Sequence, residues 1–163
     1  MSARIVTRRT FSAASALALT AAAASRVLGA NEKTRLGFIG VGNRGSQLLD
    51  AFTQLNDIQV AAVCDIYKPY LDRADQRFAG KAATFTDFRK LIDSKEIDAV
   101  VVATPDHWHA IQTVTACRAG KDVYCEKPLS ITVREGRRMV EVARETKRIV
   151  QVGTHRRSSR LYA

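Results

Sequence analysis

Two hydrophobic patterns alternate along this chain. Short apolar runs, typical of buried strands, occur at 35–39, 58–64, 82–85, 97–103, 122–125 and 149–152. Between them lie segments with apolar residues three or four positions apart, which predict helices after residue 45 (with Leu48, Phe52 and Leu55 on the buried face), at 68–78, 87–93 and about 107–119, and from 132. Strands that alternate with helices predict an α/β fold, a doubly wound parallel sheet of the Rossmann type, with ligands at the carboxyl ends of the strands.

Local signals mark several helix ends. Pro69 falls in the first turn of the 68–78 helix, and Gly80 lies just beyond its end. Asp87 and Asp106 are each placed to cap the helix that follows. Residues 132–135, Thr-Val-Arg-Glu, have the spacing of a capping box. We therefore expect a helix to begin at about residue 133.

The first strand leads into a glycine-rich loop, G-x-G-x-x-G, at residues 40–45. Gly40 permits a tight turn, Gly42 lets a pyrophosphate approach the backbone, and Gly45 lets the next helix pack against the strand. The N-terminus of that helix offers free N–H groups to phosphate. The dinucleotide contacts expected here are Gly40, Gly42, Asn43, Arg44 and Gly45.

An acidic residue follows the second strand. Asp65 stands 20 residues after Gly45, where a dinucleotide site places the carboxylate that binds the adenosine ribose. A carboxylate there repels a 2′-phosphate, so the expected cofactor is NAD or NADP, with NAD preferred. The alternative is a plain glycine turn followed by an unrelated surface aspartate.

The fourth strand is followed by residues 104–109, Thr-Pro-Asp-His-Trp-His. Pro105 stops the strand because it fixes φ and lacks an N–H group. His107 and His109 are two positions apart and do not share a helix face, so no metal site is predicted. Trp108 could lie over a cofactor ring or merely shield the helix. Structural roles are favoured for these two histidines and the tryptophan.

The fifth strand ends in Glu126-Lys127-Pro128. Lys127 could donate a hydrogen bond or a proton to a substrate oxygen, and Glu126 could orient it. The alternative is a surface ion pair. Lys-Pro after a strand favours a fixed turn, and this bond is a candidate for a cis peptide.

The glycine loop, Asp65, Thr104-Pro105…His109 and above all Glu126-Lys127-Pro128 resemble the Gfo/Idh/MocA oxidoreductase family. The resemblance covers about residues 33–157 and is strongest to exported members that are similar to glucose–fructose oxidoreductase. It implies a pyridine nucleotide and a sugar or cyclitol hydroxyl as the reacting group. It also implies that Lys127 touches the nicotinamide end and a substrate oxygen. The further cofactor contacts that it implies are Thr104, Pro105, His109, Glu126 and Lys127.

In such proteins a C-terminal α/β domain supplies the remaining catalytic residues. The resemblance therefore implies that residues 154–163 begin a second domain absent from this chain, and that Arg156 or Arg157 faces the substrate cleft. We expect the chain alone to be inactive, and the full-length protein to form a homo-oligomer. Two alternatives stand beside the oxidoreductase: an NAD-dependent glycosidase that works by oxidation and elimination, and a nucleotide-binding fragment without turnover.

Residues 1–30 have the layout of a twin-arginine signal peptide, with Arg8-Arg9 before an apolar, alanine-rich stretch. That stretch is too short and too rich in alanine for a stable membrane span. We therefore expect an exported, periplasmic protein with no membrane segment in its mature form and a dinucleotide-binding domain at 31–153. A cofactor bound before export would have to be retained.

Charge and cysteine content narrow the function further. The net charge is +10, but four positive charges lie in residues 1–30 and three more in the last eight residues. Both signs mix along the segment between, so nucleic acid is not an expected partner. The three cysteines have no metal spacing, and we expect them to be small buried residues with at least one left unpaired.

Overall fold

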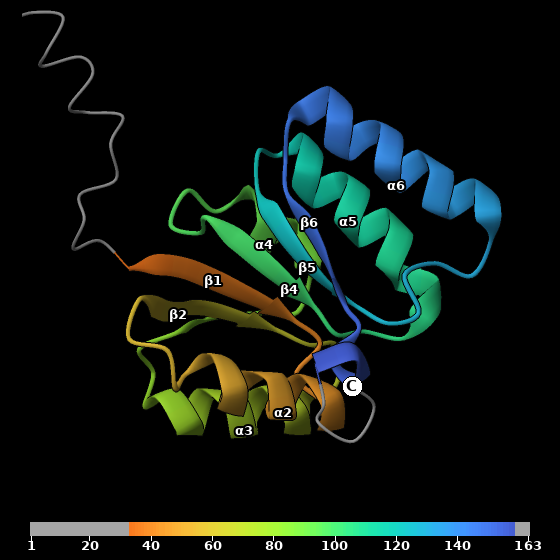
Figure 1. Cartoon of the computed structure of the whole chain (residues 1–163). Coiled ribbons are helices and arrows are strands. Elements are labelled where there is room, and N and C mark those ends of the chain that lie inside the picture. The colour runs from red at the N-terminus through yellow and green to blue at the C-terminus, as the bar shows by residue number, and fades with distance from the viewer. Residues whose placement is uncertain (1–32, 159–163) are drawn as a thin grey trace, which may run out of the picture. The chain divides into compact units, whose positions relative to one another are not determined.

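The computed structural model describes residues 33–158, which form a parallel sheet with helices on both faces (Figure 1). The strands are β1 (Thr34–Ile39), β2 (Ile58–Cys64), β3 (Ala83–Phe85), β4 (Ala99–Val102), β5 (Asp122–Glu126) and β6 (Val150–Gly153). Their order across the sheet is β3-β2-β1-β4-β5-β6, and every neighbouring pair is parallel. This confirms the predicted doubly wound sheet. The strand order reverses between β1 and β4, where such sheets bind ligands.

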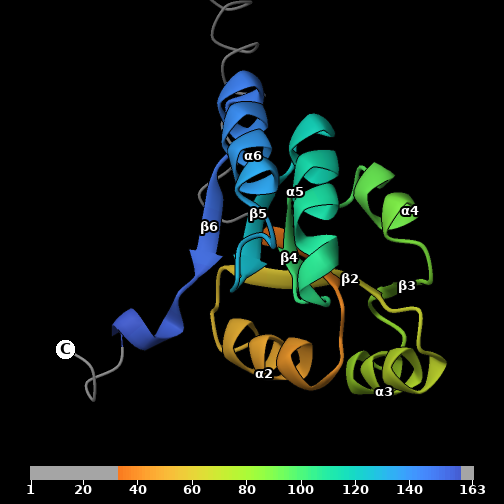
Figure 2. The same cartoon turned by 90° about the vertical axis from the view of Figure 1, so that its right-hand side faces the viewer.

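The helices divide between the two faces of the sheet (Figure 2). One face carries α2 (Asn43–Phe52) and α3 (Lys68–Phe78). The other carries α4 (Phe88–Asp93), α5 (His109–Arg118) and α6 (Val133–Thr146). The short 3-10 helix η1 (Asp106–Trp108) precedes α5, and η2 (His155–Ser158) follows β6. None of the helices within residues 33–158 has the length and apolar character to cross a bilayer.

Each face of the sheet has its own hydrophobic core. Val100 and Val102 of β4 point into the core beneath α4, α5 and α6, whereas Val101 points into the core beneath α2 and α3. All three are almost fully buried. The continuous β-branched run thus arises because β4 is covered on both faces.

Three of the predicted helix ends can be checked directly. The capping box is confirmed: the Thr132 hydroxyl accepts from the Glu135 N–H at 3.2 Å, and the Glu135 carboxylate accepts from the Thr132 N–H at 3.0 Å. Asp87 caps α4 by accepting from the N–H of Arg89 at 3.0 Å. The expected cap at Asp106 is wrong, because this residue begins η1 and its side chain makes no capping bond. The 3-10 turn delays the start of α5 to His109.

Leu55 was expected on the buried face of α2, and this is wrong. The helix ends at Phe52, and the Thr53 hydroxyl donates to the carbonyl oxygen of Leu49 at 2.7 Å. Leu55 therefore lies in the following turn, where it is 51% exposed. The spacing of apolar residues continues beyond Phe52, where α2 ends. Because Leu55 is not in the helix, the helical period does not determine the direction of its side chain.

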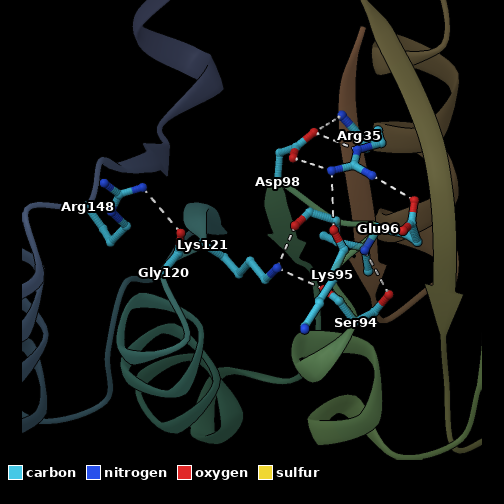
Figure 3. A network of polar contacts seen from close by, with 9 residues as sticks. Arg35, Ser94, Lys95, Glu96, Asp98, Gly120, Lys121 and Arg148 are labelled. Atoms are coloured by element: carbon cyan, nitrogen blue, oxygen red, sulfur yellow. Dashed lines mark hydrogen bonds and ion pairs between the residues drawn. The ribbon is translucent and has the colours of Figure 1, made fainter. Parts of the chain in front are cut away.

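A polar network joins the amino-terminal ends of the strands (Figure 3). Asp98 accepts from Nε and Nη2 of Arg35 at 3.1 and 2.9 Å, and from the Arg35 backbone N–H at 2.9 Å. Lys121 Nζ donates to the carbonyl oxygens of Ser94 and Ile97 at 2.8 and 2.6 Å. The hydrogen bonds from Arg35 lower the pKa of Asp98, while burial lowers the pKa of Lys121. The network therefore ties β1 and β5 to the turn that enters β4.

We expect Asp98→Ala to lower the free energy of unfolding by about 1–2 kcal/mol, because it removes a partly buried, charge-assisted set of bonds. Asp98 has a lower pKa in the folded chain than its ordinary value, so its contribution is complete above about pH 4 and is lost as the pH falls below that. Denaturant titrations at pH 7 and pH 3 should show the difference between variant and wild type shrinking at the lower pH.

The matched control is Asp72→Ala, which removes the exposed ion pair between Lys68 and Asp72. Its effect should be much smaller, since exposed pairs contribute little. Equal effects of the two substitutions at pH 7 would contradict the role assigned to Asp98.

Candidate functional site

The glycine loop begins where β1 ends, at the switch point of the sheet. Gly40 has φ +87°, and a Cβ there would lie 2.7 Å from the carbonyl oxygen of Ala103. A Cβ on Gly45 would collide with the carbonyl oxygen of Gly40. Only glycine fits at either position. The tight turn and the close packing of helix on strand are therefore as the sequence predicts.

Asp65 is tied to the same loop. Its Oδ2 accepts from the Val41 N–H, and its Oδ1 accepts from the Tyr67 N–H, both at 2.9 Å. A carboxylate has about four acceptor sites, so lone pairs remain for ribose hydroxyls. Gly42 lies beside it, and a Cβ there would be 3.0 Å from Cε2 of Tyr70. The Tyr70 ring thus packs against the segment that a pyrophosphate would approach.

A cleft of about 750 Å³ opens between these loops. Five of the predicted cofactor contacts border it: Gly40, Gly42, Asp65, Thr104 and Pro105. Other lining residues had not been predicted to do so, including Tyr70, Asp87, Phe88, Arg89 and Gln112. Phe88 and Trp108 form an edge-on aromatic pair with ring centroids 6.1 Å apart on the wall of the cleft. Asp87 could have been found from sequence, because it follows β3 as Asp65 follows β2.

His109 serves as a link between loops. It is 1% exposed, its Nε2 lies 2.8 Å from the carbonyl oxygen of Thr104, and its Nδ1 lies 2.7 Å from that of Pro128. The two carbonyl oxygens belong to different loops, and each ring nitrogen lies within hydrogen-bond distance of one of them. His109 therefore holds the loop after β4 against the loop after β5. This supports the structural role that the sequence favoured.

Glu126 contacts the first turn of α2 through Arg44, and neither Glu126 nor Lys127 lines the cleft. Glu126 is 3% exposed, and its Oε1 accepts from Nε and Nη2 of Arg44 at 2.7 and 2.6 Å. Its Oε2 accepts from the backbone N–H of Lys127 at 3.0 Å. The Lys127–Pro128 bond is cis. Glu126 thus positions the main chain of Lys127, while the ammonium is exposed and has no ion-pair partner among residues 33–158.

The remaining predicted residues lie elsewhere. Asn43 borders a smaller hollow between α2 and α3 that also contacts Arg73 and Arg77. Arg156 and Arg157 belong to η2. Arg157 is exposed, and the side chain of Arg156 lies outside the described part of the chain.

Within residues 33–158, neither the cysteine thiols nor a cluster of metal-binding side chains provides a second candidate site. Cys64, Cys117 and Cys125 are buried, as expected, and all three are free. Burial raises the pKa of Cys64 to about 12 and that of Cys125 to about 11, so both thiols stay protonated at neutral pH and are poor nucleophiles. Within residues 33–158, no three His, Cys, Asp or Glu side chains gather as a metal site would require.

Proteins that are similar to this chain in sequence include dehydrogenases and glycosidases. Glycosyl hydrolase family 109 protein 1 from Shewanella sp. (strain MR-4) is 34% identical over 125 residues, which are 72% of this chain and 27% of that protein. Inositol 2-dehydrogenase from Salmonella paratyphi B is 33% identical over 130 residues, 78% of this chain and 39% of that protein. The chain thus spans between about a quarter and two fifths of the length of these relatives.

Solved structures that superpose on this chain include two inositol dehydrogenases. Myo-inositol 2-dehydrogenase from Lactobacillus plantarum superposes with a TM-score of 0.74 at 27% identity, over 79% of this chain and 38% of that one. Scyllo-inositol dehydrogenase from Lactobacillus casei, with bound NAD(H) and scyllo-inositol, gives 0.74 at 25% identity over the same shares. The model of the oxidoreductase family with an NAD-binding Rossmann fold, Gfo/Idh/MocA, matches residues 34–154. This chain therefore belongs to the Gfo/Idh/MocA oxidoreductase family and contains its NAD-binding Rossmann domain.

Proposed function

We propose that this chain is the cofactor-binding part of an oxidoreductase that moves a hydride between a nicotinamide and a hydroxyl-bearing carbon of a cyclitol or sugar. The observation that carries the proposal is the cleft at the switch point, bordered by Gly40, Gly42 and Asp65. The named dehydrogenase relatives that act on inositols support the substrate class.

The residues present fit a dinucleotide. The backbone at Gly40 and Gly45 leaves no room for a side chain, and a Cβ on Gly42 would crowd the Tyr70 ring. The free N–H groups at the start of α2 can receive a pyrophosphate. Asp65 lines the cleft with acceptor capacity to spare for ribose hydroxyls. The bound nicotinamide would supply the hydride chemistry.

Lys127 is the proposed proton donor or acceptor at the substrate oxygen. It follows β5 at the carboxyl edge of the sheet, and its exposed ammonium is free of competing ion pairs within residues 33–158. The Glu126 carboxylate and the link from His109 to Pro128 hold its main chain from two sides. The backbone of Lys127 is thus held in place, while its side chain is exposed to solvent.

A second candidate function is the hydrolysis of glycosides through transient oxidation. Its support is the similarity to glycosyl hydrolase family 109 proteins and to an α-N-acetylgalactosaminidase from Shewanella oneidensis, which is 33% identical over 125 residues. Both candidate functions would use a nicotinamide at the same place. A dehydrogenase converts one cofactor per turnover, whereas transient oxidation returns the cofactor to its starting state within each cycle.

The cofactor preference can be tested at Asp65. We expect the chain to bind NAD more tightly than NADP, and Asp65→Asn to reduce that ratio by about ten- to a hundredfold, because the variant keeps an acceptor for the Val41 N–H but loses the charge. Calorimetric titration of both nucleotides measures the ratio. Asp87→Asn, which changes the other carboxylate of the cleft, should alter it far less. Equal or tighter binding of NADP by the wild type would refute the preference.

Catalysis can be tested in the longer protein that contains this chain. Lys127→Ala should lower turnover of a cyclitol or sugar alcohol by about 10²–10⁴-fold, the range for a lost general acid or base. The affinity for NAD should change far less, since the phosphates are expected to bind at the glycine loop of residues 40–45. Normal turnover by the variant would exclude Lys127 from the chemistry. Release of sugar from a glycoside without net change in the cofactor would instead establish the glycosidase.

We further propose export by the twin-arginine route. The support is the Arg8-Arg9 pair before an apolar stretch, which lies outside the described residues. Residues 1–32 fused to a reporter active only in the periplasm should give a signal, and replacing both arginines by lysine should abolish most of it, because lysine keeps the charge but lacks the guanidinium group. Equal signals from both leaders would contradict this route.

A further inference from the structure

An ion pair connects the glycine loop to the end of β5. Arg44 lies in the first turn of α2, and its guanidinium contacts Glu126 with two nitrogens. The Glu126 side chain is only 4% exposed, whereas that of Arg44 is 35% exposed. A buried carboxylate of this kind is stable only with its partner in place, because removing one member leaves an uncompensated charge.

The Glu126 carboxylate lies next to a glycine, Gly153, of the neighbouring strand β6. Gly153 of β6 stands opposite Glu126 in the strand register. A Cβ on Gly153 would lie 3.1 Å from Oε1 of Glu126 and 2.8 Å from Oη of Tyr124. Burial, together with the charge of Glu126, raises the pKa of Tyr124. A side chain at Gly153 would therefore crowd the Tyr124 hydroxyl and the carboxylate of the ion pair.

Arg44 reaches further contacts from the same position. Its Nη1 donates to Oε1 of Gln47 at 3.0 Å, and its Nη2 lies 3.4 Å from Nδ1 of His155 in η2. On the far side of Glu126, Oε2 accepts from the N–H of Lys127. One guanidinium thus lies between the helix terminus that receives phosphate, the turn that carries Lys127, and the segment that follows β6.

We propose that Arg44 is a positioning residue that couples the phosphate end of the cofactor site to the turn carrying Lys127. The guanidinium neutralises Glu126, which holds the Lys127 N–H. An anion bound at the start of α2 adds a second negative charge near the same cation and makes its arrangement more rigid. The filling of the phosphate site therefore orders the Lys127 turn without contact between the two. The coupling rests on the proposed function, since it needs a nucleotide at the glycine loop.

ADP is the probe for this coupling, because it fills the adenosine and pyrophosphate positions but has no nicotinamide to touch Lys127. Amide hydrogen exchange of the Lys127 N–H, followed by NMR on the whole chain, reports the order of the turn. In the wild type, ADP should slow this exchange about threefold or more. In Arg44→Met the exchange should be about tenfold faster without nucleotide, and ADP should no longer change it.

A second substitution separates positioning from general damage. Arg44→Met with Glu126→Gln leaves no unpaired charge, and the glutamine can still accept from the Lys127 N–H. Protection of that amide should return to within about threefold of the wild type, while the response to ADP should stay absent. Arg77→Met is the matched control. It breaks an ion pair with Asp50, which lies in α2 as Arg44 does, and it does not involve Glu126. It should leave both measurements unchanged.

The possible results distinguish a failure of the proposed function from a failure of the coupling. If the wild type fails to bind ADP, the proposed function fails and the coupling with it. If ADP binds but leaves Lys127 exchange unchanged, the cofactor site stands and the coupling is wrong. If Arg44→Met and its double variant exchange alike, or if Arg77→Met behaves as Arg44→Met does, Arg44 contributes only to general stability and the proposal is overturned.

Discussion

The contact between Gly45 and the carbonyl of Gly40 is the constraint on which the site depends. Without a side chain at residue 45, α2 starts directly over the end of β1. That placement is secured by the Ser46 N–H, which donates to the Gly42 carbonyl oxygen, and by the Ser46 hydroxyl, which donates to that of Val41. It directs the helix terminus toward the crevice and brings Arg44 within reach of β5. A methyl group at residue 45 would collide with the Gly40 carbonyl oxygen and force α2 away from this position.

The sequence predicted what depends on near neighbours and on strand order. The glycine loop, the capping box at Thr132 and the two-sided burial of β4 each follow from residues a few positions apart, and Asp65 follows from the known length of one strand–helix–strand unit. The doubly wound order then follows from the alternation of elements. The prediction that Leu55 is buried on the helix was wrong, because the spacing of apolar residues does not show where a helix ends.

Contacts between distant residues were beyond this reasoning. Arg44 and Glu126 are 82 positions apart, and Arg35 and Asp98 are 63 apart. A sequence shows that Glu126 and Lys127 are adjacent, which suggested that the acid would orient the amine. The structure instead pairs the buried carboxylate with Arg44, at a point where the neighbouring Gly153 adds no side chain. Adjacency in sequence was a poor guide to which charges meet.

The polar network of Arg35, Asp98 and Lys121 lies at the amino-terminal ends of the strands, whereas the cleft lies at their carboxyl ends. Residues that fasten the sheet and residues that meet a ligand are thus separate sets on the same strands. The lining of the cleft can therefore change without breaking the hydrogen bonds that hold β1, β4 and β5 together at the opposite edge of the sheet.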